Sequence, residues 1–192
     1  MGKFLRAALL LTILASCGYR APPQNQDDAC AIARERPGYM RDMMATERRW
    51  GVPVAVQMAT IYQESGFRRG ARTPYRWALG IIPMGRASSA LGYAQVLNST
   101  WDDYRSQTGR YGASRKNFRD ASDFIGWYMD RSYRQAGIPK SDARDQYLAY
   151  HEGIGGYLSR SYRSKGWLIG VANRVESRAK LYNTQLLSCG WY

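Results

Sequence analysis

The most constraining feature of the sequence is an apolar segment, between Pro53 and Gly66, that ends in a glutamate. Its apolar side chains recur at i, i+4, i+7 and i+8, which is the spacing of one buried helix face: Val54, Met58, Ile61 and Tyr62. Proline suits the first helical turn, where its missing N–H costs nothing, and glycine commonly ends a helix. We therefore expect a helix over residues 53–65, with Glu64 in its last turn.

This position is unfavourable for an anion. The negative end of the helix dipole opposes ionisation of a carboxyl there, and apolar neighbours add a desolvation cost. Both effects raise the pKa of Glu64, so the sequence predicts a carboxyl that keeps its proton near neutral pH. A general acid that protonates a glycosidic oxygen needs such a carboxyl. For a lone glutamate, a surface charge at a helix end is the simpler interpretation.

Other periodic segments also predict helices, and no alternating strand pattern stands out. We expect helices over residues 30–49, 121–136, 141–151 and 168–186, and a further helix after residue 98 that Ser99 or Thr100 caps. Residues 68–90 are rich in glycine and proline and predict an ordered flap beside the site. The predicted fold class is therefore mainly α, with a single multi-helix domain over residues 30–192.

The chain is strongly basic, with 28 Lys and Arg residues against 15 Asp and Glu, a formal net charge of +13. Such a charge favours anionic partners. The basic residues are spread out and no nucleic-acid motif is found, so nucleic acid is not an expected partner. Tyrosine and tryptophan, which number 15 and 6, line carbohydrate grooves as well as cores. His151 is the single histidine, and the sequence supports no metal site.

Residues 1–16 have the pattern of a secretory signal peptide, in which Lys3 and Arg6 precede a short apolar run. That run is shorter than the roughly 20 apolar residues of a membrane-spanning helix. Leu14-Ala15-Ser16-Cys17 resembles the bacterial lipobox, where a signal peptidase cuts before the cysteine and lipid is attached to it. Residues 17–29 are then expected to form a lipidated tether. A secreted protein with a chance cysteine is the alternative.

The lipobox resemblance implies a destination. Because Gly18 rather than Asp follows the cysteine, an outer-membrane lipoprotein that faces the periplasm is expected, and a triacylated Cys17 suffices for stable anchoring. In that oxidising compartment we expect a disulfide between Cys30 and Cys189, which bracket the domain. Two free thiols or intermolecular pairing are the alternatives.

Three short motifs follow one another along the chain: Glu64-Ser65, Gly92-Tyr93-Ala94-Gln95 and Ala149-Tyr150-His151-Glu152-Gly153. Their order resembles the soluble-lytic-transglycosylase domain, a relative of goose-type lysozymes, which has Glu-Ser at a helix end, then Gly-x-x-Gln, then Ala-Tyr-Asn-Ala-Gly. The resemblance covers most of residues 52–157 and implies a lysozyme-like domain with a substrate groove. The flap from residue 75 to 90 is longer than the common pattern and suggests a distinct branch of the family.

The resemblance also implies roles for individual residues. Glu64 matches the catalytic acid, and Ser65 matches the serine that orients this acid or binds substrate. Gln95 matches the glutamine that contacts sugar in the groove. Tyr150 matches the tyrosine whose hydroxyl approaches the catalytic carboxyl, and Gly153 matches the motif glycine.

Two positions depart from the family pattern, since His151 and Glu152 stand where the family has Asn and Ala. His151 can still hydrogen-bond an N-acetyl group of the substrate, or it is a packed, hydrogen-bonded imidazole. Glu152 is either a second carboxyl near Glu64 or a charge at a helix end, and we favour the latter.

The activity implied by the resemblance is that of a lytic transglycosylase, a carbon–oxygen lyase. Such an enzyme cleaves the β-1,4 bond between N-acetylmuramic acid and N-acetylglucosamine in peptidoglycan without water and leaves 1,6-anhydromuramic ends. One acid suffices, because the substrate's 2-acetamido group stabilises the oxocarbenium centre. No metal or organic cofactor is implied. Peptidoglycan glycan strands are the expected partner, together with the membrane through the N-terminal lipid.

Three other interpretations remain open from the sequence. A hydrolase of the same fold needs a second carboxylate to activate water, for which Asp102, Asp103 and Glu152 are candidates. A non-catalytic envelope lipoprotein could grip peptidoglycan through a basic, aromatic surface. The domain could also open the wall for a secretion or conjugation machine, although no partner motif is found.

Overall fold

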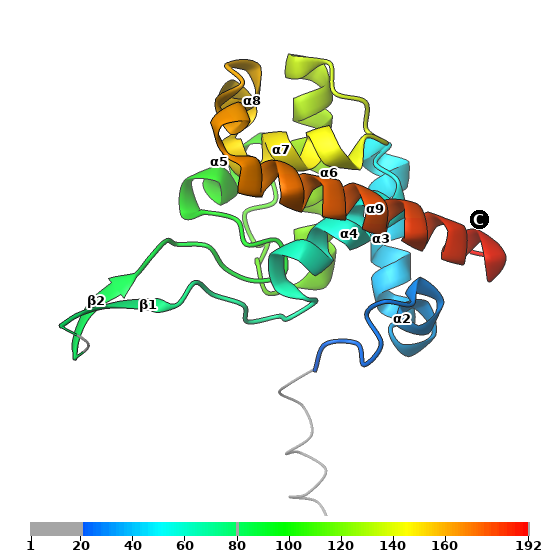
Figure 1. Cartoon of the computed structure of the whole chain (residues 1–192). Coiled ribbons are helices and arrows are strands. Elements are labelled where there is room, and N and C mark those ends of the chain that lie inside the picture. Colours follow the sequence, from blue (N-terminus) through cyan, green and yellow to red (C-terminus); the bar gives the residue numbers. More distant parts are fainter. Residues whose placement is uncertain (1–20, 80, 192) are drawn as a thin grey trace, which may run out of the picture.

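The structure is a computed structural model that describes residues 21–79 and 81–191 (Figure 1). The predicted signal peptide, Cys17 and the first residues of the predicted tether therefore lie outside the described residues. The described part is mainly helical, as expected, and a two-stranded hairpin projects from the helical body. None of its helices combines the length and the apolar character that crossing a membrane requires.

The helix that carries Glu64 lies at the centre of the fold. This helix, α4 (Val54–Ser65), follows Pro53 and ends at Gly66, whose φ of 55° is left-handed, as predicted. The long C-terminal helix α9 (Gly166–Ser188) packs against both α4 and α7 (Ala143–Glu152) (Figure 1). Most of α4 is buried, whereas residues 62–64 in its last turn are only partly buried.

The segment predicted as one helix over residues 30–49 is two helices, α2 (Ala29–Glu35) and α3 (Pro37–Trp50). The break falls at Arg36, whose φ and ψ are −129° and 61°. A proline disfavours the helical conformation in the residue before it, so Pro37 explains why the helix stops and starts again. The buried face of α3 includes Met40 and Met43.

The helix α6 (Phe118–Ala136) packs closely on α3. A Cβ at Gly126 would lie 2.5 Å from Cγ2 of Thr46 and 2.6 Å from Cδ1 of Trp50. Glycine is therefore what allows these two helices to approach so closely. The predicted core helix over residues 121–136 is thus confirmed, with Phe124 and Ile125 buried.

The cap predicted for the next helix is wrong. This helix, α5 (Asn98–Thr108), begins after Leu97, and neither Ser99 nor Thr100 caps it. The Ser89 hydroxyl from the flap instead accepts a hydrogen bond from the Asn98 N–H at 3.0 Å. A tertiary contact therefore replaces the local cap that the sequence pattern indicated.

The flap contains a hairpin that the sequence analysis missed. Strands β1 (Tyr75–Ala78) and β2 (Ile82–Arg86) pair antiparallel, with Tyr75 opposite Arg86 and a register irregularity between residues 75 and 77. Strands of four and five residues are too short to show a clear alternating pattern. Beyond α7, the chain forms a short helix, α8 (Ile154–Leu158), followed by the 3₁₀ turn η1 (Ser161–Ser164).

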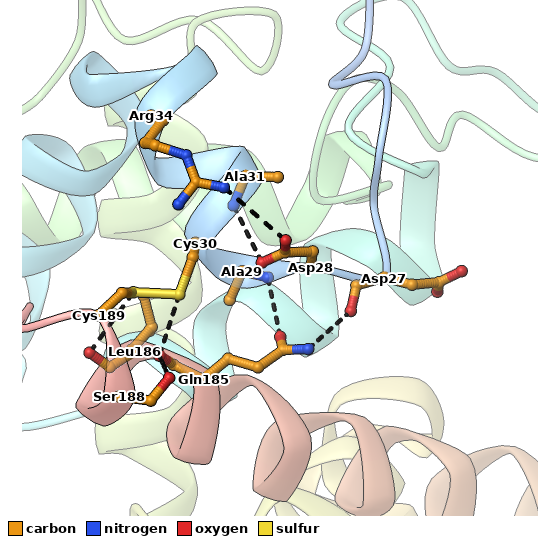
Figure 2. Close-up of a disulfide and its surroundings, with 10 residues drawn as sticks. All are labelled: Asp27, Asp28, Ala29, Cys30, Ala31, Arg34, Gln185, Leu186, Ser188 and Cys189. Carbon is orange, nitrogen blue, oxygen red and sulfur yellow. Dashed lines mark hydrogen bonds and ion pairs between the residues drawn. A yellow bond between two sulfur atoms is a disulfide. The ribbon is translucent and has the colours of Figure 1, made fainter.

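The two ends of the described chain are joined by the predicted disulfide between Cys30 and Cys189 (Figure 2). Beside it, the Gln185 side chain accepts a hydrogen bond from the Ala29 N–H at 2.8 Å and donates one to the Asp27 carbonyl at 3.1 Å. Arg178 also forms an ion pair with Asp27 at 2.8 Å. The described residues of the predicted tether, 21–28, therefore lie against the domain rather than forming a free linker.

Candidate active site

A cleft of about 520 Å³ lies between α4, α6, α7 and the segments that flank the hairpin. It brings together five of the residues that the sequence singled out: Glu64, Gln95, Tyr150, His151 and Glu152, with the motif glycine Gly153 beside them. Phe124 and Tyr128 of α6 add two aromatic rings to the wall of the cleft. The motifs thus meet in one groove, although almost 90 residues separate the first from the last.

Glu64 occupies the electrostatic position that the sequence predicted. Burial raises the pKa of its carboxyl from 4.5 to about 7, and a hydrogen bond from the Tyr147 hydroxyl opposes part of that rise. Burial disfavours the charged form, whereas a hydrogen bond to the carboxylate favours it. Near neutral pH the carboxyl is therefore populated in both its protonated and its ionised form. This is the property of a group that must donate a proton and then take one back.

The tyrosine that reaches Glu64 is not the one that the motif indicated. Tyr147 hydrogen-bonds to Glu64, and this contact together with burial raises the pKa of the Tyr147 hydroxyl well above its usual range. Tyr150 lines the cleft close to Glu64, but its hydroxyl donates to the Ala94 carbonyl at 2.6 Å. Tyr147 and Tyr150 are three residues apart on α7 and share a face, which was the signal available in the sequence.

Ser65 does not enter the cleft. Its side chain is 1% exposed, and its hydroxyl donates to the Ile61 carbonyl at 3.1 Å within α4. A serine near the end of a helix commonly bonds back to the carbonyl four residues earlier. The arrangement therefore gives Ser65 a structural contact in the helix end that carries Glu64, and no direct contact with a ligand in the cleft.

Gln95 lines the cleft from a tightly folded turn. Its φ is 47°, and its side-chain amide donates to the carbonyls of Ala71 and Gly92, each at 2.8 Å. Both amide hydrogens are thus committed to the protein, so a ligand in the cleft meets the side-chain oxygen as an acceptor. Gln95 also joins the start of the flap to the Gly92 turn, a structural role that the motif did not indicate.

Glu152, the last residue of α7, is an ion paired within the protein rather than a freely solvated charge. Its side chain is 4% exposed, and it accepts hydrogen bonds from Lys165 Nζ at 2.8 and 2.9 Å and from the Ser161 hydroxyl at 2.5 Å. These contacts, Lys165 first, lower the pKa of Glu152 to about 2. A carboxylate held this firmly as an anion is a weak base, poorly suited to activating water.

His151 combines the two interpretations that the sequence left open. Its Nδ1 lies 3.2 Å from the Glu152 carboxylate, and its ring packs edge-on against Trp167, with the centroids 5.2 Å apart. The side chain is nevertheless 37% exposed and lines the cleft. The imidazole is therefore held in place by the protein and also accessible to a ligand. Within the described residues, no group of three or more His, Cys, Asp or Glu side chains is arranged to hold a metal ion.

Replacing Glu64 with Gln is expected to stabilise the protein at pH 8 but not at pH 4. Its pKa is about 7 in the folded chain against an ordinary value of 4.5. Below pH 4.5 the carboxyl is protonated in both states and contributes no difference. Above pH 4.5 the Glu64 carboxyl ionises in the unfolded chain before it ionises in the folded one. By pH 8 this difference has lowered the free energy of unfolding of the wild type by at most about 3 kcal/mol. Denaturant unfolding of both proteins at the two pH values measures this difference.

The matched control is Glu176→Gln, which removes a carboxylate from α9 that is paired with Lys180 on the surface. It is expected to change the free energy of unfolding by less than about 1 kcal/mol at either pH. An equal effect of Glu64→Gln at pH 4 and at pH 8 would contradict the raised pKa of Glu64.

A comparison with protein families gives a match over nearly the whole chain. The family model described as the transglycosylase SLT domain matches residues 5–189, which include every residue of the cleft. No curated protein matches the chain.

Proposed function

Because the chain belongs to the transglycosylase SLT domain family, within the lysozyme-like superfamily, we propose that it is a lytic transglycosylase that cleaves peptidoglycan strands between N-acetylmuramic acid and N-acetylglucosamine. The observation that carries the proposal is the carboxyl of Glu64, which lies in the cleft with a pKa near neutrality. A group with this pKa serves as acid in one step and as base in the next.

In the first step, protonated Glu64 donates its proton to the glycosidic oxygen, and the bond from that oxygen to the anomeric carbon of muramic acid breaks. The 2-acetamido group of the substrate stabilises the positive charge that develops at this carbon. In the second step, ionised Glu64 removes the proton from the C6 hydroxyl of the same sugar while the oxygen attacks the anomeric carbon. The products are a free 4-hydroxyl and a 1,6-anhydro ring, and Glu64 regains its proton.

The contacts of Glu152 support the non-hydrolytic reaction over hydrolysis. Hydrolysis through two carboxylates needs a second one that is free to activate water. Among the described residues that line the cleft, Glu152 is the one acidic side chain besides Glu64. Its oxygens already accept hydrogen bonds from Lys165 and Ser161. Asp102 is bonded to Arg105 on α5, and neither Asp102 nor Asp103 is among the residues that line the cleft.

The product decides between the two reactions. Purified protein is incubated with peptidoglycan sacculi, and the soluble fragments are analysed by mass spectrometry. The proposal expects muropeptides with 1,6-anhydromuramic ends. Fragments that are heavier by one water and carry a reducing end would establish a hydrolase instead. Absence of soluble fragments would favour a binding protein without catalytic activity.

We also propose that the protein is an outer-membrane lipoprotein that faces the periplasm and is anchored through Cys17. The lipobox-like sequence and the disulfide between Cys30 and Cys189 support this location, since disulfides persist in oxidising compartments. A Cys17→Ala variant is expected to move from the membrane fraction to the soluble fraction of cells. A Cys17→Ala variant that stays in the membrane fraction would contradict the anchor.

A further inference from the structure

A second, smaller cavity of about 200 Å³ lies beside the cleft and is lined by three arginines, Arg72, Arg86 and Arg115. We call this cavity the arginine pocket. The rest of its wall consists of small, polar or apolar residues, with no acidic side chain among the described residues that line it: Ser88, Ser89, Ala90, Leu91 and Asn98. The pocket lies where the end of the flap leads back to the helical body, and Asn98, the first residue of α5, forms part of its wall.

Two of the arginines are held in place by backbone carbonyls. Arg115 Nη1 donates to the carbonyls of Ser89 at 3.0 Å and Val96 at 2.9 Å. Arg86 Nη1 donates to the Thr73 carbonyl at 2.7 Å, and its guanidinium lies 4.3 Å from the centre of the Tyr75 ring. These contacts orient the guanidinium groups without neutralising their charge.

The positive charge of the pocket is not balanced within the described part of the chain, where none of the three arginines forms an ion pair. Asp102 attracts Arg115, but Asp102 is itself bonded to Arg105 at 2.7 Å. Burial and the like charges of Arg72 and Arg105 lower the pKa of Arg115. Arg86 and Arg115 are fixed, partly buried cations, whereas Arg72 is exposed at the rim. Cations with unused donors favour an anion that accepts hydrogen bonds.

The arginine pocket adjoins the candidate catalytic cleft. Ala90 lines both cavities. Arg72 also lines a depression of about 480 Å³ that Glu64 and Gln95 line as well. An anionic group that is covalently attached to a sugar beside Glu64 can therefore reach the arginines without leaving the surface of the protein.

We propose that the arginine pocket binds a carboxylate of the peptide that the muramic acid residue of the bound strand carries. This inference rests on the proposed function, because the muramic acid at the cleaved bond bears the peptide on its lactyl group. Several carboxylates of that peptide are ionised at neutral pH. A planar guanidinium matches a carboxylate with two parallel hydrogen bonds. The pocket would make the enzyme prefer peptide-bearing strands over bare glycan.

The first test compares two substrates, intact peptidoglycan and glycan strands from which an amidase has removed the peptides. The variant Arg72→Gln/Arg86→Gln is expected to raise KM about tenfold on the peptide-bearing substrate, which corresponds to one lost charge-assisted contact. Its kcat and its activity on bare strands are expected to stay at the wild-type level. The single variant Arg72→Gln, which removes no hydrogen bond within the described residues, should show the same selective loss to a smaller degree.

The control is Arg41→Gln/Arg48→Gln, which removes two exposed charges from α3, away from both cavities. It is expected to behave like the wild type on both substrates apart from a uniform effect of net charge. An equal loss by the pocket variants on peptide-bearing and bare strands would overturn the proposal. So would a wild-type enzyme that cleaves both substrates with the same KM.

A binding experiment separates this inference from the proposed reaction. The Glu64→Gln protein is titrated by calorimetry with the free stem tetrapeptide, with the same peptide after amidation of its carboxylates, and with inorganic phosphate. We expect binding of the tetrapeptide that weakens on amidation and on Arg72→Gln. Phosphate that binds as tightly as the peptide would overturn the proposal in favour of a phosphate-bearing ligand. Peptide binding by the Glu64→Gln protein, together with a wild-type protein that makes no anhydro product, would contradict the proposed function alone.

Discussion

Replacing Glu64 with Gln is expected to lower the rate of anhydro-muropeptide release by about a thousandfold, within the range found for a single general acid–base group. Glutamine keeps the size of the side chain and can still accept a hydrogen bond from Tyr147. It cannot donate a proton to the glycosidic oxygen or remove one from the C6 hydroxyl. Initial rates on purified sacculi, with products separated by chromatography, measure the loss.

Two observations show whether this loss is chemical. The circular dichroism spectrum of Glu64→Gln should match that of the wild type, and Glu176→Gln on α9 should keep its activity. Since the first step needs the protonated acid, kcat/KM of the wild type should decline as the pH rises through about 7. Activity of Glu64→Gln within tenfold of the wild type would remove Glu64 from the proposed role.

Replacing Gly92 with Ala is expected to destabilise the protein by about 3 kcal/mol and to lower activity more than tenfold. Gly92 has a φ of 79°, and a Cβ there would lie 2.0 Å from the Arg115 carbonyl oxygen and 2.6 Å from its carbon. Both contacts are to backbone, so the turn must move as a whole. Because Gln95 donates to the Gly92 carbonyl, that movement also displaces a residue of the cleft.

Thermal unfolding and the sacculus assay measure the two effects. Gly112→Ala is the matched control, because it lies in the neighbouring loop, its φ is not positive, and nothing lies within 4 Å of its added Cβ. It is expected to be neutral or slightly stabilising. Equal stability of the Gly92→Ala and Gly112→Ala proteins would contradict the tight packing of the Gly92 turn.

The helices could be predicted from the sequence because their buried faces repeat over several turns. The glutamate helix, α6, α7 and α9 lie close to their predicted bounds. The hairpin was missed, since short strands carry little periodic signal, and the Ser89 cap of α5 was missed because it comes from another segment. The break before Pro37 was readable from local rules, but the apolar pattern on both sides of it favoured one continuous helix.

The same distinction holds for the site. The motifs placed Glu64, Gln95, Tyr150 and His151 around one cleft, as their order along the chain indicated. The contact from Tyr147 to Glu64 could not be predicted in the same way, because it depends on how α7 packs on α4. The ion pair of Glu152 with Lys165 depends in turn on the path of the chain through α8 and η1. The residue types in the sequence identify the chemical groups of the site, whereas tertiary packing decides which of their atoms remain available to a ligand.

The clasp formed by Cys30, Cys189 and Gln185 has a mechanical consequence. Tension applied at the N-terminal end of the domain passes through the covalent bridge into α9 instead of unwinding α2 turn by turn. Because α9 packs along both α4 and α7, that tension is spread over the interior of the domain. A domain held at this end can thus bear tension while α4, which carries Glu64, keeps its packing against α9.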